Sequence, residues 1–347
     1  MTGADRPYRV VQWATGNIGR RSLRAVLEHP ALTLAGVRVH SEAKAGRDAG
    51  ELCGVGPTGV LATTDEDEVL ALGADCVLYM PLLCDVDEVC RLLASGANVV
   101  TTCTDFVRPA SLDPEVRARL EAACAAGGTS LHSTGSSPGF ISEAVPLVLT
   151  SVQRRLDRLA IEESADLSSR DSPELLFGLM GFGAPPAEVD ARRVAHLKSS
   201  FGPSLELVAD ALGLPLDGVE ATGEVAVASR AVTIAAGPLE AGTVAGQRTT
   251  IAGIRDGRTL ISFRATWYCT DQLEPAWEVR PNGWHVVVEG DAPLEVDIRL
   301  AVPAERMAET TPGYTAHRAV NAVPYVCDAA PGLRSTVDLP TIVARLG

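Results

Sequence analysis

The first 150 residues alternate between two hydrophobic patterns. Short, continuous apolar runs are separated by segments in which apolar residues recur at helical spacing. Continuous runs are typical of strands buried on both faces, and their alternation with helices is typical of a doubly wound parallel sheet. The predicted strands are Tyr8–Ala14, Leu32–Val39, Cys76–Met80, Asn98–Cys103 and Thr129–His132, and the predicted helices are Asn17–Glu28, Asp85–Ser95 and Pro114–Ala126.

After Thr150 the segments become longer, and apolar and polar residues partly alternate within them. Such alternation is typical of antiparallel strands with one buried face. In "IAGIRDGRTLISFRA" the pair Asp256-Gly257 suits the positive φ values of a tight hairpin turn. This half therefore predicts an α+β domain on an open, mainly antiparallel sheet, with helices on one face. Its predicted elements are a strand at Leu156–Ser164, a helix at Ala187–Leu212 and several strands between Val219 and Leu300.

The stretch "ATGNIG" ends the first predicted strand and opens the first predicted helix. It has the spacing of the dinucleotide-binding fingerprint, with alanine at the first glycine position. Gly16 would let the backbone approach a pyrophosphate, Gly19 would let the helix pack on the strand, and Ala14 requires only that the turn use ordinary φ values. Unpaired N–H groups at the helix start would bind the pyrophosphate. The expected contacts are Ala14, Thr15, Gly16, Asn17, Ile18, Gly19 and Arg20.

The length of 347 residues exceeds what one hydrophobic core normally supports. We therefore expect two domains. A Rossmann α/β domain that binds the dinucleotide is predicted over residues 1–150, and an α+β domain for substrate binding and dimerisation over residues 151–305. Residues 306–347, which return to a helical pattern, are expected to pack back on the Rossmann domain.

Composition excludes several kinds of partner. A formal net charge of −14 argues against nucleic acid, whose binding rests on clustered Lys and Arg. No apolar run is long enough to span a bilayer, and the N-terminus lacks the apolar core of a signal peptide, so we expect a cytoplasmic protein with no membrane partner. The eight cysteines show no C-x-x-C pair and no His at metal-ligand spacing, so we expect reduced thiols and no metal.

The segment after the second predicted strand bears on the choice of cofactor. An NAD enzyme usually has an acid there for the ribose hydroxyls, whereas an NADP enzyme offers cations and hydroxyls to the 2′-phosphate. Cations and hydroxyls predominate, which favours NADP, with its 2′-phosphate near Ser41 and Lys44. NAD stays possible if Glu42 binds the ribose and Lys44 is only a solvated loop charge. The basic and hydroxyl side chains of this segment are Arg38, His40, Ser41, Lys44 and Arg47.

Ligands of such sheets bind beyond the carboxyl ends of the strands. Three predicted loops leave those ends, after Met80, Val100 and Leu131. On these loops, Asp105 is the only carboxylate that directly follows a strand, so it is the candidate catalytic residue, able to hold and deprotonate an ammonium. The alternative is that Asp105 caps a helix or turn before Pro109. Further cofactor contacts expected on these loops are Pro81, Leu82, Cys103 and Gly135.

Large apolar side chains in "PGF", "ELLFGLMGFG" and "FRATWYC" predict a substrate pocket that the second domain would close. An apolar pocket with few polar groups suits a small hydrophobic carbonyl compound. The alternative is that most of these side chains belong to the hydrophobic core. The expected pocket residues are Phe140, Phe177, Met180 and Trp267.

Six segments, in order, resemble the dihydrodipicolinate reductase-like family, in the branch of 2,4-diaminopentanoate dehydrogenase and the native amine dehydrogenases. They are "WATGNIGRRSLRAV", "HSEAKAGRDAGELCG", "CVLYMPLL", "NVVTTCTDF", "GTSLHSTGSSPGF" and "HRAVNAVPYVCDAAPGL". The resemblance implies a homodimeric NAD(P)-dependent oxidoreductase that acts on CH–NH2 or C=N groups. Such an enzyme aminates small ketones or aldehydes with ammonia, or runs the reverse oxidation. In the amine dehydrogenases a Glu after the strand matching Asn98–Cys103 positions ammonia, and Asp105 matches it with one methylene fewer.

Two other functions stay open at this point. An imine or carbonyl reductase would transfer hydride without using ammonia. A catalytically inactive NADP-sensing protein would bind the cofactor without turnover. Dihydrodipicolinate reductase activity is not expected, because the chain has no His-His pair and Lys198 stands outside the signature that binds its substrate carboxylates.

Overall fold

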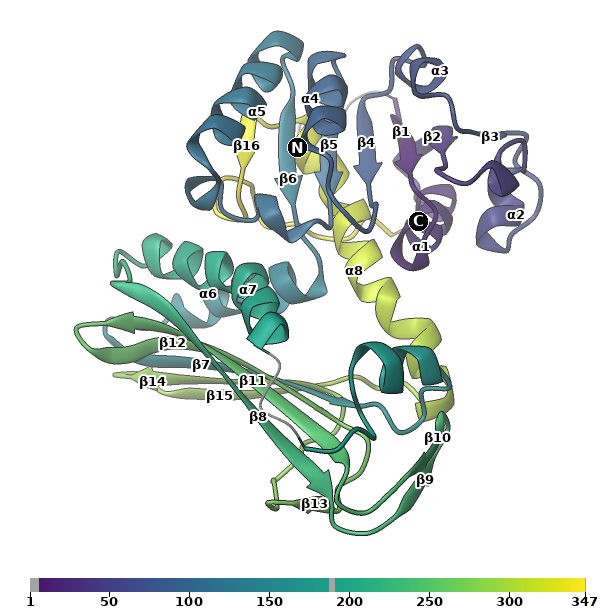
Figure 1. Ribbon diagram of the computed structural model, residues 1–347. Coiled ribbons are helices and arrows are strands. Elements are labelled where there is room, and N and C mark those ends of the chain that lie inside the picture. Colours follow the sequence, from purple (N-terminus) through teal and green to yellow (C-terminus); the bar gives the residue numbers. More distant parts are fainter. Residues whose placement is uncertain (1–5, 187–190, 347) are drawn as a thin grey trace. The chain divides into compact units, whose positions relative to one another are not determined.

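The computed structural model describes residues 6–186 and 191–346 (Figure 1). Contacts divide the chain into two units, Met1–Phe140 with Thr311–Gly347, and Ile141–Thr310. The sequence analysis predicts the domain limits after residues 150 and 305. Each unit contains one seven-stranded sheet.

The sheet of the first unit is parallel throughout, with the order β16-β6-β5-β4-β1-β2-β3. The chain order reverses between β1 and β4, which lie side by side, so the carboxyl ends of these two strands form the switch point where such sheets bind ligands. The doubly wound parallel sheet is therefore confirmed. Its strands are β1 (Tyr8–Trp13), β2 (Leu32–Arg38), β3 (Ala62–Thr63), β4 (Cys76–Tyr79), β5 (Asn98–Thr101), β6 (Ser130–Ser133) and β16 (Gly332–Arg334).

Helices cover both faces of this sheet. The fully buried neighbours Val10 and Val11 on β1 belong to opposite hydrophobic clusters. The cluster of Val10 includes residues of α1 and α8, and the cluster of Val11 includes residues of α4 and α5. Burial on both faces explains why the strands are continuous apolar runs. The helices are α1 (Asn17–Glu28), α2 (Ala49–Cys53), α3 (Glu66–Leu70), α4 (Val86–Ala94), α5 (Pro114–Gly127) and α8 (Ala304–Cys327), of which α2 and α3 were not predicted.

The sheet of the second unit has the order β13-β8-β11-β12-β7-β14-β15. Only the β12–β7 pair is parallel in this sheet as described, so a mainly antiparallel sheet is confirmed. The predicted hairpin turn is also confirmed, since Asp256 and Gly257 have φ values of 52° and 70° between β11 and β12. The strands are β7 (Leu156–Asp166), β8 (Gly218–Ala228), β11 (Val244–Arg255), β12 (Arg258–Tyr268), β13 (Leu273–Glu274), β14 (Gly283–Gly290) and β15 (Leu294–Arg299), with a separate pair of β9 (Val232–Ile234) and β10 (Gly237–Leu239).

The helices of the second unit, α6 (Val145–Thr150) and α7 (Ala191–Ala211), lie on one side of its sheet in Figure 1. Phe201 of α7 stacks on Phe263 of β12, with ring centroids 4.0 Å apart. The first four residues of the predicted helix at 187–212 lie outside the described residues. Helices on one face of the sheet agree with the α+β prediction.

Three further findings concern the cysteine thiols, possible metal ligands and possible membrane-spanning helices. All eight cysteines are free thiols. Over residues 6–186 and 191–346, no three His, Cys, Asp or Glu side chains come together as metal ligands would. Within the same residues, no helix combines the length and the apolar character needed to cross a membrane.

Candidate functional site

The turn after β1 has an unusual backbone at Ala14. Its φ is 69°, in the left-handed region that residues with a Cβ rarely adopt, so the prediction of ordinary φ values is wrong. The Ala14 amide donates to the Arg38 carbonyl at 2.9 Å. The Ala14 carbonyl accepts from Nε2 of the fully buried Gln12, also at 2.9 Å. These two bonds hold a conformation that the first glycine of the fingerprint adopts without strain.

The two glycines of the turn have different surroundings. A Cβ on Gly19 would lie 2.1 Å from the Ala14 carbonyl oxygen, so only glycine lets α1 pack this closely on the turn. A Cβ on Gly16 would meet no atom within 4 Å, so the backbone there faces open space. Gly16 is also the N-cap of α1 and forms no side-chain cap, which leaves the N–H groups of the first turn for an anion. This turn therefore fits a dinucleotide pyrophosphate.

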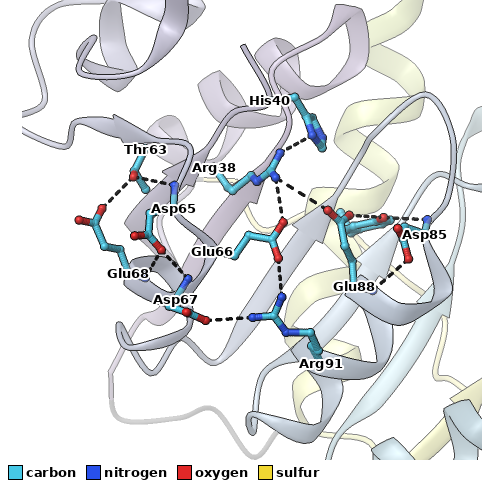
Figure 2. A network of polar contacts seen from close by, with 11 residues as sticks. Arg38, His40, Thr63, Asp65, Glu66, Asp67, Glu68, Asp85, Glu88 and Arg91 are labelled. Carbon is cyan, nitrogen blue, oxygen red and sulfur yellow. Dashed lines mark hydrogen bonds and ion pairs between the residues drawn. The ribbon is translucent and has the colours of Figure 1, made fainter. Parts of the chain in front are cut away.

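The guanidinium of Arg38, at the end of β2, is part of the ion-pair network in Figure 2. Its Nη2 lies 2.8 Å from Oε1 of Glu66 and 3.9 Å from Oε1 of Glu88, and the side chain is only 10% exposed. The indole of Trp13 lies beneath the guanidinium, 5.1 Å from it. Arg91 holds the other oxygen of Glu66 at 2.7 Å. Because carboxylates of α3 and α4 neutralise Arg38, this residue is not a free cation for a phosphate.

The other basic residues after β2 differ in their partners. Arg47 forms an ion pair with Glu51 at 2.7 Å. Burial, together with the positive charge of the neighbouring arginine, lowers the pKa of His40, so this imidazole is neutral at neutral pH. Lys44 donates from Nζ to the carbonyl oxygen and Oγ1 of Thr15, at 3.0 and 3.2 Å, and has no carboxylate partner in the described part of the chain. Among the described basic residues that follow β2, Lys44 is therefore the cation that no carboxylate balances.

Asp105 lies on the 3₁₀ turn Thr104–Phe106 that follows β5. Its side chain is exposed, and within residues 6–186 and 191–346 its carboxylate has no hydrogen bond or ion pair. The next residue, Phe106, is buried and fixes the turn to the sheet. Arg108 occupies the cap before Pro109, so Asp105 does not cap that turn. The carboxylate is thus available at the carboxyl edge of the sheet.

The thiol of Cys103 lies in a buried contact between neighbouring loops. Its Sγ is 3.9 Å from the Pro81 carbonyl oxygen, and Ser133 Oγ donates to the Cys103 carbonyl at 2.6 Å. A hydrogen bond from the Cys84 thiol lowers the pKa of Cys103, and the same contact raises the pKa of Cys84. Beyond Pro81, the side chain of Leu82 is 98% exposed, so an apolar surface is open at this edge.

The loop after β6 carries Gly135. A Cβ on Gly135 would come within 3.1 Å of the Pro138 carbonyl oxygen and of Thr315, so the loop is closely packed. Within the described residues, the buried hydroxyls of Thr134 and Ser137 have no hydrogen-bond partner. Buried polar groups normally find a partner, so these two hydroxyls are exceptions within the loop.

Three of the four predicted pocket residues meet in the second unit. Phe177, Met180 and Trp267 are half-buried and pack against one apolar cluster that includes Leu176 and Phe182. They therefore lie at the edge of a core rather than in its centre. Phe140, the fourth, belongs to the first unit.

Sequence reasoning missed a buried carboxylate in the second unit. Glu143 is fully buried, and its Oε1 accepts from Ser204 Oγ at 2.7 Å. Ser142 Oγ lies 2.8 Å from the same hydroxyl. The sequence gives no signal for this network, because Ser204 lies 61 residues beyond Glu143 on α7.

Two family descriptions match the chain. Residues 10–126 match the N-terminus of dihydrodipicolinate reductase. Residues 188–347 match the C-terminal domain of 2,4-diaminopentanoate dehydrogenase. The first match covers strands of the first sheet, and the second match covers strands of the second sheet.

Individual relatives extend these matches over the whole length. An amine dehydrogenase from Streptomyces virginiae is 32% identical, with 97% of this chain and 98% of that protein covered. A 2,4-diaminopentanoate dehydrogenase from Acetoanaerobium sticklandii is 24% identical, with 83% and 80% covered. Among solved structures, an amine dehydrogenase from Mycobacterium smegmatis has the same fold, with a TM-score of 0.76 at 21% identity and 99% of both chains covered.

Proposed function

This chain belongs to the amine dehydrogenase branch of the dihydrodipicolinate reductase-like family, and we propose that it aminates small ketones or aldehydes with ammonia, or runs the reverse deamination. Membership makes it an NAD(P)-dependent oxidoreductase that acts on CH–NH2 groups. The observation that carries the ammonia step is the exposed carboxylate of Asp105 at the carboxyl edge of the first sheet, which has no partner within the described residues.

In this proposal Asp105 moves one proton in each direction. The amination combines a carbonyl compound, an ammonium ion and a hydride, and it releases an amine and a water molecule. The carboxylate takes a proton from ammonium, which frees the nitrogen lone pair to attack the carbonyl carbon. In the adduct, one proton passes from the nitrogen to the oxygen, and the protonated carboxyl group gives the oxygen a second proton, so that the oxygen leaves as water and an iminium remains. The bound nicotinamide supplies the hydride.

The cofactor would be held by the fingerprint turn and by the residues after β2. The open backbone at Gly16 and the uncapped first turn of α1 suit the pyrophosphate. We propose NADP as the preferred cofactor, with Lys44 and the exposed Ser41 on its 2′-phosphate, because Lys44 is the cation there without a carboxylate partner in the described chain. NAD is the alternative, with the exposed Glu42 on the ribose hydroxyls.

Replacing Lys44 with alanine is expected to weaken NADPH binding by roughly tenfold or more and to leave NADH binding nearly unchanged. A hydrogen bond to a charged group contributes about 1.5–3 kcal/mol, which corresponds to roughly ten- to hundredfold in affinity. Fluorescence titration with each cofactor measures the effect. Arg47→Ala is the matched control, because Arg47 is already paired with Glu51. An equal loss of affinity for both cofactors would remove Lys44 from the phosphate site.

The proposal also covers the class of substrate and the oligomeric state. The side chains of Phe177, Met180 and Trp267 gather at one apolar cluster, which supports a small hydrophobic carbonyl compound as substrate. The resemblance to the amine dehydrogenases supports a homodimer, which light scattering on a sizing column would test.

The direct test is NADPH and NADH oxidation by purified protein over a panel of small ketones and aldehydes, each with and without ammonium. We expect turnover that depends strictly on ammonium and an amine as product. Turnover of the same compounds without ammonium would instead indicate a carbonyl reductase. Cofactor binding with no turnover under any of these conditions would favour a sensing protein.

A further inference from the structure

The two faces of the second sheet differ in chemistry. Phe263 of β12 points to α7, so its neighbour Arg264 points to the opposite face. Arg264 lies in register with Glu162 of β7, and two residues further along β12, Thr266 lies in register with Ser164 of β7 and Arg248 of β11. Two adjacent rows of polar side chains therefore cross three strands on the face away from α7.

A loop between β13 and β14 closes part of this face. Tyr268 Oη donates to the Arg280 carbonyl at 2.8 Å and fixes the end of the loop to the sheet. Between the loop and the strands lies a cavity of about 360 Å³, a size that suits a small ligand. Its walls include Glu162, Arg248, Arg264, Trp277, Glu278 and Arg280, and none of these was predicted to bind the cofactor or the amine substrate.

Three arginines and two glutamates, Glu162 and Glu278, line the cavity. Glu162 is shared by Arg264 at 3.1 Å and Arg280 at 3.8 Å. Within residues 6–186 and 191–346, Arg248 has no carboxylate at ion-pair distance, and its recorded hydrogen bond is from Nε to Thr266 Oγ1 at 3.3 Å. Burial and the charge of Arg264 lower the pKa of Arg248, although Glu224 and Glu162 act in the opposite direction. The terminal N–H groups of Arg248 are thus unused donors on a half-buried cation.

The orientation of Arg248 determines what it can bind. The ring of Trp277 lies 4.2 Å from the guanidinium carbon and covers it. A guanidinium covered on its face donates hydrogen bonds in its own plane, where two parallel N–H groups match the two oxygens of a carboxylate or a phosphate. The hydroxyls of Thr266 and Ser164 also line the cavity and can donate to such a group.

We propose that this cavity is a binding site for a small anionic metabolite, whose carboxylate or phosphate group is held by Arg248 and Arg264 under Trp277. The anion pairs with Arg248, which has no carboxylate at ion-pair distance within the described residues, whereas Arg264 is paired with Glu162 and Arg280 with Asp297. The rest of the ligand occupies the space between the loop and the strands. The site belongs to the second unit alone and does not depend on the proposed amination.

The proposal is tested by titrating the full-length protein with citrate and with inorganic phosphate in a calorimeter, at constant ionic strength and with saturating cofactor. Saturating cofactor fills the sites that bind its own phosphates. We expect saturable binding of one probe, and which probe binds identifies the carboxylate or the phosphate. Arg248→Gln is expected to weaken this binding by roughly tenfold or more, because it removes a charged donor but keeps a planar group under Trp277. Arg158→Gln is the control, since Arg158 lies on β7 outside the cavity and is paired with Glu289.

Three results would overturn the proposal. They are no saturable binding of either probe, equal binding by wild type and Arg248→Gln, and conversion of a dimer to a monomer by Arg248→Gln without any anion binding. The last result would show that a second copy of the chain fills the cavity. If Arg248→Gln does not fold, Thr266→Val takes its place and is expected to weaken the probe less strongly.

Discussion

Replacing Gly19 with alanine is expected to lower the free energy of unfolding by about 2–3 kcal/mol and to abolish measurable cofactor binding. The added Cβ would lie 2.1 Å from the Ala14 carbonyl oxygen. That oxygen cannot withdraw without losing the hydrogen bond from the buried Gln12. Helix α1 would therefore move away from the turn and take its N–H groups with it. Chemical denaturation and a fluorescence titration with NADPH measure the two effects.

Gly16→Ala separates cofactor binding from packing. Gly16 has φ −74°, which alanine adopts without strain, and a Cβ there would meet no atom within 4 Å. We expect unchanged stability but cofactor binding weakened by roughly tenfold or more, because a methyl group would occupy the space that the pyrophosphate needs. If Gly16→Ala bound the cofactor as tightly as the wild type, the pyrophosphate would not lie on this turn. If Gly19→Ala were as stable as the wild type, the contact with Ala14 would not limit the packing of α1.

The sequence predicts the first sheet well, because one physical cause acts on every strand. The strands are buried on both faces, so residues as close as Val10 and Val11 must both be apolar although they point into different clusters. Helix α5 shows the same agreement at its ends, where Asp113 caps the first turn and Gly128 ends the helix in the left-handed conformation. Local signals of this kind do not depend on distant contacts.

The backbone of Ala14 could not be predicted in the same way. An alanine in place of glycine favours ordinary φ values when only its neighbours are considered. Its observed φ of 69° is held by the side chain of Gln12 and by a backbone bond to Arg38 on the neighbouring strand. The partners of Ala14 become visible only when the strands are assembled.

Arg38 illustrates the same limit for the candidate site. From the sequence it is one of several cations near the expected 2′-phosphate. Its partner Glu66 lies 28 residues later, on a helix that was not predicted, and Glu88 lies in the first turn of α4. Once these carboxylates are placed, the unbalanced charge after β2 belongs to Lys44. The electrostatics of the site thus depend on which side chains meet, and the chain order of the residues does not specify this.

Asp105→Asn is expected to reduce ammonium-dependent turnover by at least about tenfold and to leave cofactor affinity and stability unchanged, since general acid–base groups typically contribute more than this. The amide keeps the size of the side chain but cannot accept a proton from ammonium. Stability should not change, because the carboxylate is exposed and unpaired in the described chain, while the buried Phe106 fixes the turn. Steady-state kinetics with saturating ammonium and cofactor titration measure the two parts of this prediction.

Two further variants show whether the loss is specific to a carboxylate at this position. Asp105→Glu restores the residue of the amine dehydrogenases that this chain resembles, so it should retain much of the turnover that Asp105→Asn loses. Asp157→Asn removes an exposed carboxylate from β7 and should leave turnover unchanged. Full activity of Asp105→Asn would contradict a proton-transfer role. If Asp105→Asn lost amination but still reduced the same carbonyl compounds, hydride transfer would be independent of this carboxylate, and Asp105 would serve the ammonia step alone.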